Sequence, residues 1–161
     1  GVVSAVAESA EEVFVPITMA ELDDVVRIEN DVYAFPWTRG NFEDTLRAGH
    51  LAWALHRRPW GIIAYAIAML AVDEAHLLNL SVAAPFHRRG YGWKMLEWMA
   101  DRAREYGARS LLLEVRPSNT AALHLYERYG FERIGVRAGY YPAAGGRENA
   151  QKSQPLMQTF V

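Results

Sequence analysis

The sequence predicts a mixed α/β fold of one domain. Short β-branched and apolar runs alternate with longer segments of helical spacing, in the order β-α-α-β-β-β-α-β-α-β-β. A length of 161 residues allows one domain and argues against two. The composition, 51% hydrophobic and 22% charged, is typical of a globular rather than a disordered chain. We therefore expect a central sheet of about seven strands, with about four helices packed against it.

The first elements begin after an acidic N-terminal segment. Residues 1–12 are small and acidic with little periodicity, and we expect a mobile tail there, followed by a single domain over residues 13–161. A β-rich run at 13–17 predicts the first strand. Thr18-Met19-Ala20-Glu21 is a capping box that predicts a helix ending near residue 32. Its helically spaced positions are Leu22, Val25, Val26 and Glu29.

The later elements follow from the same patterns. Thr38 is the expected N-cap of a second helix, which ends near residue 48. Met95, Met99 and Ala103 lie on one face of a third helix, with Leu96 and Ala100 beside them. The remaining predicted elements are strands at 51–56, 61–70 and 74–82, the third helix at 91–106, a strand at 110–115, a helix from 118 or 119 to 130, and strands at 131–136 and 156–160.

Composition also excludes several classes of protein. The chain has no cysteine, which excludes disulfides, thiolate metal sites and a cysteine nucleophile. A cysteine-free chain fits a reducing compartment, and we expect a cytoplasmic protein. The longest apolar run, residues 61–72, is too short to span a bilayer, and no signal sequence opens the chain. We expect that Gly1 is not the natural start, since a Met would stand there.

The net charge of −2 conceals an uneven distribution. Residues 1–80 carry a charge of −7 and residues 81–161 a charge of +5. This split suggests that the two halves bind ligands of opposite charge. Alternatively, the uneven distribution of surface charge has no function. Acidic charge dominates the first half and there is no recognised nucleic-acid motif, so we expect no direct contact with nucleic acid.

Residues 79–93 are the most informative segment, because a strand ends there, a basic loop follows and a helix begins. The loop reads Arg88-Arg89-Gly90-Tyr91-Gly92-Trp93. Unpaired N–H groups and the dipole at a helix N-terminus, with adjacent arginines, favour a phosphate, and glycine lets the backbone approach it. The loop is neither a Walker A motif nor a dinucleotide fingerprint. The same residues also fit a helix start with a solvated basic turn.

Two more segments carry groups that can move protons. Glu114 interrupts the apolar strand at 110–115, where it could serve as a general base. Alternatively it pairs with Arg116 on a solvated face, because residues two apart in a strand share a face. Tyr126 lies on the apolar stripe of the helix that ends at Gly130. It is either a core aromatic or a proton donor at the mouth of a cleft.

These three segments, in this order and spacing, resemble the GNAT superfamily of acetyl-CoA-dependent N-acetyltransferases. Residues 88–93 are similar to its pyrophosphate loop, Arg/Gln-x-x-Gly-x-Gly/Ala, with His87 in the first slot of the strict pattern. Residues 13–149 further resemble the RimI-type ribosomal-protein-alanine N-acetyltransferases. The motifs that carry this second resemblance are Ala34-Phe35-Pro36-Trp37, Asn79-Leu80-Ser81-Val82, Leu113-Glu114-Val115-Arg116-Pro117-Ser118-Asn119, Leu125-Tyr126, Gly130-Phe131 and Tyr140-Tyr141-Pro142.

The resemblance implies a GNAT fold, in which a mixed, mostly antiparallel sheet has a V-shaped splay between the strands at 74–82 and 110–115. It also implies which residues hold acetyl-CoA. Leu80, Ser81 and Val82 would hydrogen-bond the pantetheine arm through their backbone, and Asn119 would contact the pantetheine or the sulfur end. The residues that would cradle the pyrophosphate are Arg88, Arg89, Gly90, Tyr91, Gly92 and Trp93.

The implied chemistry is direct acetyl transfer without a metal. Glu114 resembles the family's general base and Tyr126 its general acid. The implied acceptor is the N-terminal Ala of a ribosomal protein. The candidate walls of its pocket are Phe35, Trp37, Tyr140 and Tyr141, whose aromatic rings could equally serve loop packing. The sequence departs from the family at 144–149 and adds a polar stretch at 151–154, so the last loop matches the family pattern least.

Two other functions stay open at this point. The chain could be a GNAT enzyme that acetylates a small amine, such as a polyamine, an amino acid or an aminoglycoside. It could also be a non-catalytic acetyl-CoA-binding module, although retention of Glu114, Tyr126 and Asn119 weighs against that. We expect no membrane partner, and we favour a monomer.

Overall fold

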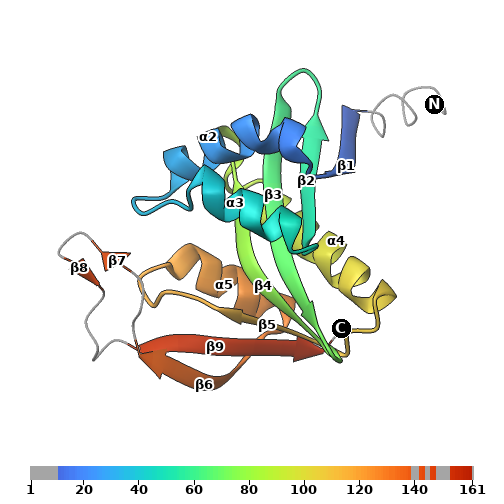
Figure 1. Cartoon of the computed structure of the whole chain (residues 1–161). Helices are drawn as coiled ribbons and strands as arrows, with labels where there is room; N and C mark the ends of the chain where they lie inside the picture. Colours follow the sequence, from blue (N-terminus) through green and yellow to red (C-terminus); the bar gives the residue numbers. More distant parts are fainter. Residues whose placement is uncertain (1–10, 139–141, 144–145, 148–152, 161) are drawn as a thin grey trace. The chain divides into compact units, whose positions relative to one another are not determined.

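Figure 1 shows a computed structural model of the chain, which describes residues 11–138, 142–143, 146–147 and 153–160. The helical elements are η1 (Met19–Glu21), α2 (Leu22–Val32), α3 (Arg39–Arg47), η2 (Ala84–Phe86), α4 (Tyr91–Glu105) and α5 (Thr120–Tyr129). The strands are β1 (Glu12–Pro16), β2 (Leu51–Arg57), β3 (Gly61–Ala71), β4 (Glu74–Val82), β5 (Ser110–Glu114), β6 (Glu132–Ala138), β7 (Pro142–Ala143), β8 (Gly146–Arg147) and β9 (Ser153–Phe160). The predicted α/β class is confirmed.

Seven strands form one open, mostly antiparallel sheet in the order β1-β2-β3-β4-β5-β9-β6. The parallel pair is β4 with β5, and their ladder runs from Glu74 opposite Ser110 to Leu77 opposite Leu113. β4 continues beyond this ladder to Val82. An early end of the ladder is what the predicted splay between these strands requires. β7 and β8 form a separate two-stranded sheet.

The chain divides into two compact units. The first unit comprises Gly1–Ile67 and Asn79–Leu96, and the second comprises Ala68–Leu78 and Glu97–Val161. β3, β4 and α4 each have residues in both units. The single domain predicted over residues 13–161 stays a prediction.

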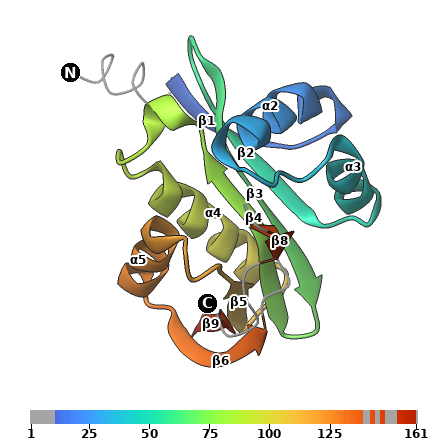
Figure 2. The same ribbon diagram turned by 90° about the vertical axis from the view of Figure 1, so that its left-hand side faces the viewer.

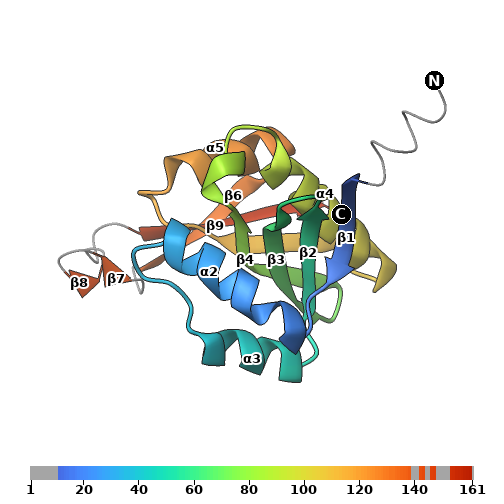
Figure 3. The same ribbon diagram turned by 90° about the horizontal axis from the view of Figure 1, so that it is seen from above.

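In the first unit, α2 and α3 lie side by side against one face of β2 and the first part of β3 (Figure 3). The predicted stripe of α2 is buried there, with Leu22 and Val25 fully inaccessible to solvent. They belong to a core that includes Phe42 and Tyr65, whose rings meet edge to face with centroids 5.9 Å apart. Burial of this apolar stripe is the main force that holds α2 on the sheet.

In the second unit, α5 lies beside the strands β5, β9 and β6 (Figure 2). β9 pairs antiparallel with both β5 and β6, and Leu111 of β5 and Met157 of β9 are fully buried.

The predicted apolar face of α4 is confirmed, because all five of its positions are buried. Those positions are Met95, Leu96, Met99, Ala100 and Ala103.

Several boundaries differ from the sequence expectations. The first strand begins at Glu12, one residue earlier than predicted, and the Glu11 carbonyl oxygen accepts from the Arg58 N–H at 2.9 Å, so the predicted tail does not include these two residues. Residues 1–10 lie outside the described residues. The predicted first helix begins as a separate 3-10 turn, η1, and the Thr18 capping box caps the N-terminus of this turn. The last strand begins at Ser153 rather than 156, because it pairs with Ala138 at the end of β6. None of the helices in the described segments is long and apolar enough to cross a membrane.

Candidate active site

The C-terminal end of β4, in the first unit, is held by side chains from two loops. Ser81 is buried, with 3% of its surface exposed, and Leu80 and Val82 are half-buried. The Tyr33 hydroxyl donates to the carbonyl oxygen of Leu80 at 3.0 Å. His87 Nε2 lies 2.6 Å from the carbonyl oxygen of Val82, and it carries the proton because a carbonyl only accepts. The backbone that was predicted to bind pantetheine is therefore fixed from both sides of Ser81.

The basic loop that follows β4 has the backbone shape expected of an anion-binding turn. Arg88 and Gly90 adopt left-handed conformations, with φ of +62° and +85°. Arg88 and Arg89 are exposed, and Lys94 N–H donates to the Gly90 carbonyl as the first bond of α4. An α-helix leaves its first N–H groups without partners inside the helix. The loop thus brings two arginines to a helix N-terminus, where anions are favoured.

Phe86 anchors this loop to the first unit. Its ring is buried, and it meets the rings of Trp60 and Tyr91 edge to face at centroid distances of 5.4 and 5.8 Å. The Arg89 guanidinium lies 5.6 Å from the centroid of the same ring, within range of a cation–π contact. The loop conformation is therefore supported by aromatic packing below it.

Tyr91 can contribute to anion binding only through its backbone, because its side chain points inward. The ring is 5% exposed, and its hydroxyl donates to Glu12 Oε1 at 2.8 Å. Arg57 and Lys94 bind the same carboxylate at 3.1 and 2.9 Å. Burial raises the pKa of Glu12, but the hydrogen bonds from Lys94 and Tyr91 and the charges of Lys94 and Arg57 outweigh it, so the net pKa is lowered. β1 is thereby tied to the start of α4.

The second unit carries the two predicted proton-transfer groups. Glu114 is the last residue of β5 and is half-buried, between the buried Leu113 and Val115. Tyr126 lies on α5 with 8% of its surface exposed, and its ring packs on Phe131 at a centroid distance of 5.4 Å. Both descriptions offered for Tyr126 agree with this burial, and its role stays a prediction.

Asn119, also in the second unit, is the N-cap of α5. Its side-chain oxygen accepts from the Ala122 N–H at 3.2 Å. This settles the choice between Ser118 and Asn119 as the cap. A role of Asn119 in binding acetyl-CoA would therefore be additional to a structural role.

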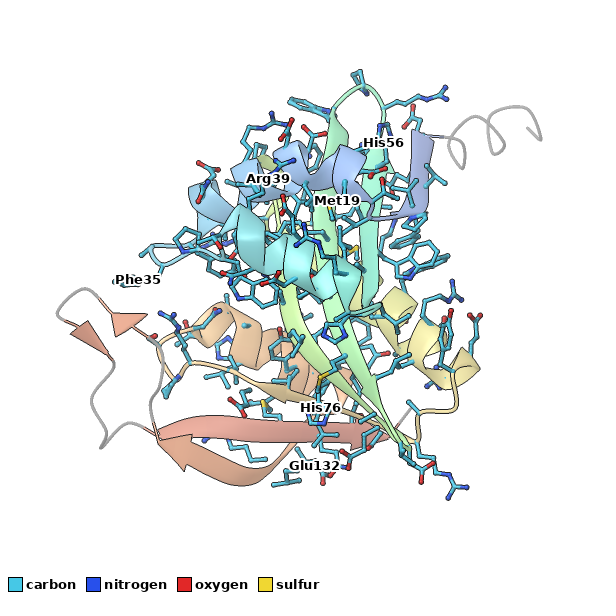
Figure 4. The ribbon with its side chains drawn as sticks, in the orientation of Figure 1. Met19, Phe35, Arg39, His56, His76 and Glu132 are labelled. Atoms are coloured by element: carbon cyan, nitrogen blue, oxygen red, sulfur yellow. The ribbon has the colours of Figure 1, made fainter. Side chains whose placement is uncertain are left out.

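The candidate acceptor residues differ in how they are placed. Phe35 projects from the loop between α2 and α3 (Figure 4), with 39% of its surface exposed. Trp37 instead packs on Phe42, with ring centroids 5.2 Å apart, so its ring contributes to packing of the loop on α3. Tyr140 and Tyr141 lie outside the described residues.

The structure adds a buried polar cluster that the sequence analysis did not identify as a site. Glu29 is 2% exposed and accepts hydrogen bonds from the Tyr65 hydroxyl, from Asn79 Nδ2 at 2.9 Å and from the Trp37 N–H at 2.9 Å. Burial, followed by the charge of Glu29, raises the pKa of Tyr65, which keeps its hydroxyl a donor. The signal was present in the sequence, because Glu29 continues the apolar stripe four residues after Val25.

The described part of the chain contains no group of three or more His, Asp or Glu side chains placed to hold a metal ion. The polar groups at the end of β4 and at the start of α4 are hydroxyls, amides, guanidinium groups and backbone N–H groups. These are suited to an anionic and amide-rich ligand.

Comparison with known proteins decides the family. The model of the acetyltransferase (GNAT) family matches residues 22–131. The chain belongs to this family. It is 37% identical to the [ribosomal protein bS18]-alanine N-acetyltransferase of Escherichia coli K12 over 130 residues, which cover 81% of this chain and 87% of the relative. The enzyme of the same name from Salmonella typhimurium is also 37% identical, with 83% and 90% covered.

A solved structure agrees with this assignment to the GNAT family. The crystal structure of the ribosomal-protein-S18-alanine N-acetyltransferase from Escherichia coli superposes with a TM-score of 0.83 and 31% sequence identity. The match covers 93% of this chain and 94% of that one. This GNAT protein is accordingly an acetyl-CoA-dependent N-acetyltransferase.

Proposed function

We propose that this GNAT enzyme transfers the acetyl group of acetyl-CoA to the N-terminal alanine of a ribosomal protein. The observation that carries the proposal is the similarity to the bS18-alanine acetyltransferases, which extends over more than four fifths of both chains. Glu114 and Tyr126, which the resemblance assigns to proton transfer, and Asn119, which it assigns to acetyl-CoA binding, are all present.

The described residues fit the anionic part of acetyl-CoA. At Gly90 no heavy atom lies within 4 Å of the position a Cβ would take, so the backbone is open to a close neighbour. Arg88 and Arg89 are exposed, so both charges are accessible to phosphate oxygens. In this proposal residues 88–93 bind the pyrophosphate, and the backbone of Leu80–Val82 binds the pantetheine amides.

The proposed reaction needs one proton acceptor and one proton donor. An α-amine is largely protonated near neutral pH, so Glu114 accepts a proton from it through a water molecule. The amine nitrogen then forms a bond to the thioester carbonyl carbon and releases its second proton to water, and the carbon–sulfur bond breaks. Tyr126 donates its proton to the departing thiolate. A backbone N–H of β4, such as that of Val82, stabilises the negative charge on the carbonyl oxygen.

Acetylation of defined peptides tests the acceptor. The protein is incubated with acetyl-CoA and with peptides that begin with Ala-Arg, Ser or Met, and with an N-terminally blocked peptide that has an internal Lys. Mass spectrometry locates the acetyl group. We expect it on the α-amine of the Ala-Arg peptide. Acetylation of only the internal Lys, or of only free polyamines, amino acids or aminoglycosides, would refute the proposed acceptor.

Two substitutions test the proposed proton transfers. Glu114→Gln and Tyr126→Phe should each lower kcat by about 10²- to 10⁴-fold, the usual contribution of a general acid or base. CoA affinity, measured by calorimetry, should stay near that of the wild type. Glu127→Gln and Tyr129→Phe, on the same helix as Tyr126, are the matched controls and should retain turnover. Wild-type turnover in both test variants would show that the assignment is wrong.

A further inference from the structure

Glu29 connects three segments of the first unit through one buried carboxylate. It lies on α2, and its three donors come from β3, from β4 and from the loop between α2 and α3. Burying a carboxylate is costly unless hydrogen bonds compensate for the lost water. Packing of α2 alone would be served better by an apolar residue at this position of its stripe. The three bonds therefore point to a task in fixing the segments that they join.

The two carboxylate oxygens of Glu29 are divided between these segments. Oε1 accepts from the Tyr65 hydroxyl and from Asn79 Nδ2, and Oε2 accepts from the Trp37 N–H. One oxygen thus holds the sheet, through β3 and β4, and the other holds the loop. Tyr65 remains a donor because burial and the charge of Glu29 raise its pKa.

A second connection runs from Asn79 back to the start of the same loop. Asn79 Oδ1 lies 3.2 Å from Ser81 Oγ, which lies 2.9 Å from the Tyr33 hydroxyl oxygen. The Tyr33 hydroxyl in turn donates to the carbonyl oxygen of Leu80 at 3.0 Å. The loop is therefore anchored at both ends, by Tyr33 on β4 and by Trp37 on Glu29. Phe35, between the two anchors, is exposed.

We propose that Glu29 is a positioning residue that fixes the α2–α3 loop to the end of β4, so that one hydrogen-bonded cluster shapes both the acceptor-binding loop and the pantetheine-binding strand. The assignment of these two segments to the acceptor and to acetyl-CoA rests on the proposed function. The fixing of the loop by Glu29 does not depend on that assignment. An acceptor that reaches along the loop should depend on Glu29 more than a minimal amine does.

Substitution of Glu29 separates these tasks. Glu29→Ala removes both acceptor oxygens and leaves three buried donors, so it tests the whole cluster but can prevent folding. Glu29→Gln has nearly the same shape and keeps one acceptor oxygen. That oxygen can accept either from the donors of the sheet or from the donor of the loop, but not from both. Glu43→Gln is the matched control for the same chemical change, because Glu43 is a half-buried residue of α3 whose carboxylate pairs with Arg39 and Arg47 outside the cluster.

The first measurement compares two acceptors in steady-state kinetics, an Ala-Arg peptide of about ten residues and alaninamide. For Glu29→Gln, kcat/KM for the peptide should fall by about tenfold through KM, the factor expected when one hydrogen bond to a charged group is lost. The value for alaninamide should change by less than about threefold. Glu43→Gln should leave the ratio of the two acceptors unchanged. Equal losses for both acceptors, or none, would overturn the positioning role.

The second measurement needs no substrate. Hydrogen–deuterium exchange is followed in the segments 33–42 and 79–86, with β1 as the internal reference. Exchange in 33–42 or 79–86 should accelerate in Glu29→Gln but not in Glu43→Gln. If the wild type fails to acetylate the Ala-Arg peptide, the proposed function is wrong, and exchange alone decides the inference. Unchanged exchange in both segments would overturn the inference even in an active enzyme.

Discussion

Substitution of Asn119 should separate a structural contribution from a ligand contribution at the same side chain. Asn119→Ala removes the oxygen that accepts from the Ala122 N–H at 3.2 Å. This distance is at the long end of the N–H···O range and Asn119 is only half-buried, so we expect a loss of about 0.5 to 1 kcal/mol of unfolding free energy. In a protein of this size the loss corresponds to a decrease of about 1 to 4 °C in Tm. Asn119→Asp keeps an acceptor at the cap and adds a negative charge that a helix N-terminus favours, so its stability should equal that of the wild type.

Thermal and urea unfolding measure the first effect, and calorimetric titration with CoA measures the second. If Asn119 also contacts the pantetheine or the sulfur end, both variants should bind CoA more weakly, because neither keeps the amide N–H₂ group. Thr18→Ala is the control, since Thr18 caps η1 and has no predicted contact with CoA. Equal destabilisation of Asn119→Asp and Asn119→Ala would refute the capping argument. Wild-type CoA affinity in both would refute the predicted contact.

Two further outcomes follow from the structure. The pKa of Glu12 is lowered in the folded chain from its ordinary value of 4.5, so its contribution to stability is complete above that value and is lost as pH falls through the folded-state pKa. The difference in unfolding free energy between the wild type and Glu12→Gln should therefore stay constant from pH 7 to about pH 5 and shrink as urea unfolding is repeated down to about pH 3, and a constant difference over the whole range would contradict this linkage. Gly130 ends α5 with φ of +119°, so Gly130→Ala should cost about 1 to 2 kcal/mol although the space for a Cβ is adequate. Gly40→Ala, inside α3, should be neutral or stabilising in the same urea assay, and the argument fails if both substitutions have the same sign.

Local patterns predicted most of the fold. The periodicity of α4 identified five buried positions, and the Thr18 capping box and the Thr38 N-cap marked where helical structure begins. These features depend on residues three or four apart, which are neighbours on any helix. Strand boundaries near the C-terminus were predicted less well, because the start of β9 is set by pairing with β6 rather than by its own composition.

The side-chain clusters of the first unit could not be predicted in the same way. Glu29 meets Tyr65 and Asn79, which are 36 and 50 positions away, and Glu12 meets Lys94, which is 82 positions away. A single sequence shows that a carboxylate stands on an apolar stripe, but it does not show which donors will surround it. Trp37 illustrates the same limit, since an aromatic residue in a loop can face a ligand or a core.

The sequence by itself determined the α/β class, the order of the helices and of the seven strands of the main sheet, and the family, but it did not predict β7 and β8. Those properties reside in periodicity, caps and motifs, which are local along the chain. Only the tertiary structure decided that Tyr91 turns inward to Glu12 and that Glu29 joins the α2–α3 loop to β4. Such contacts arise when burial brings distant polar groups out of water, since each group must then find its partner within the protein.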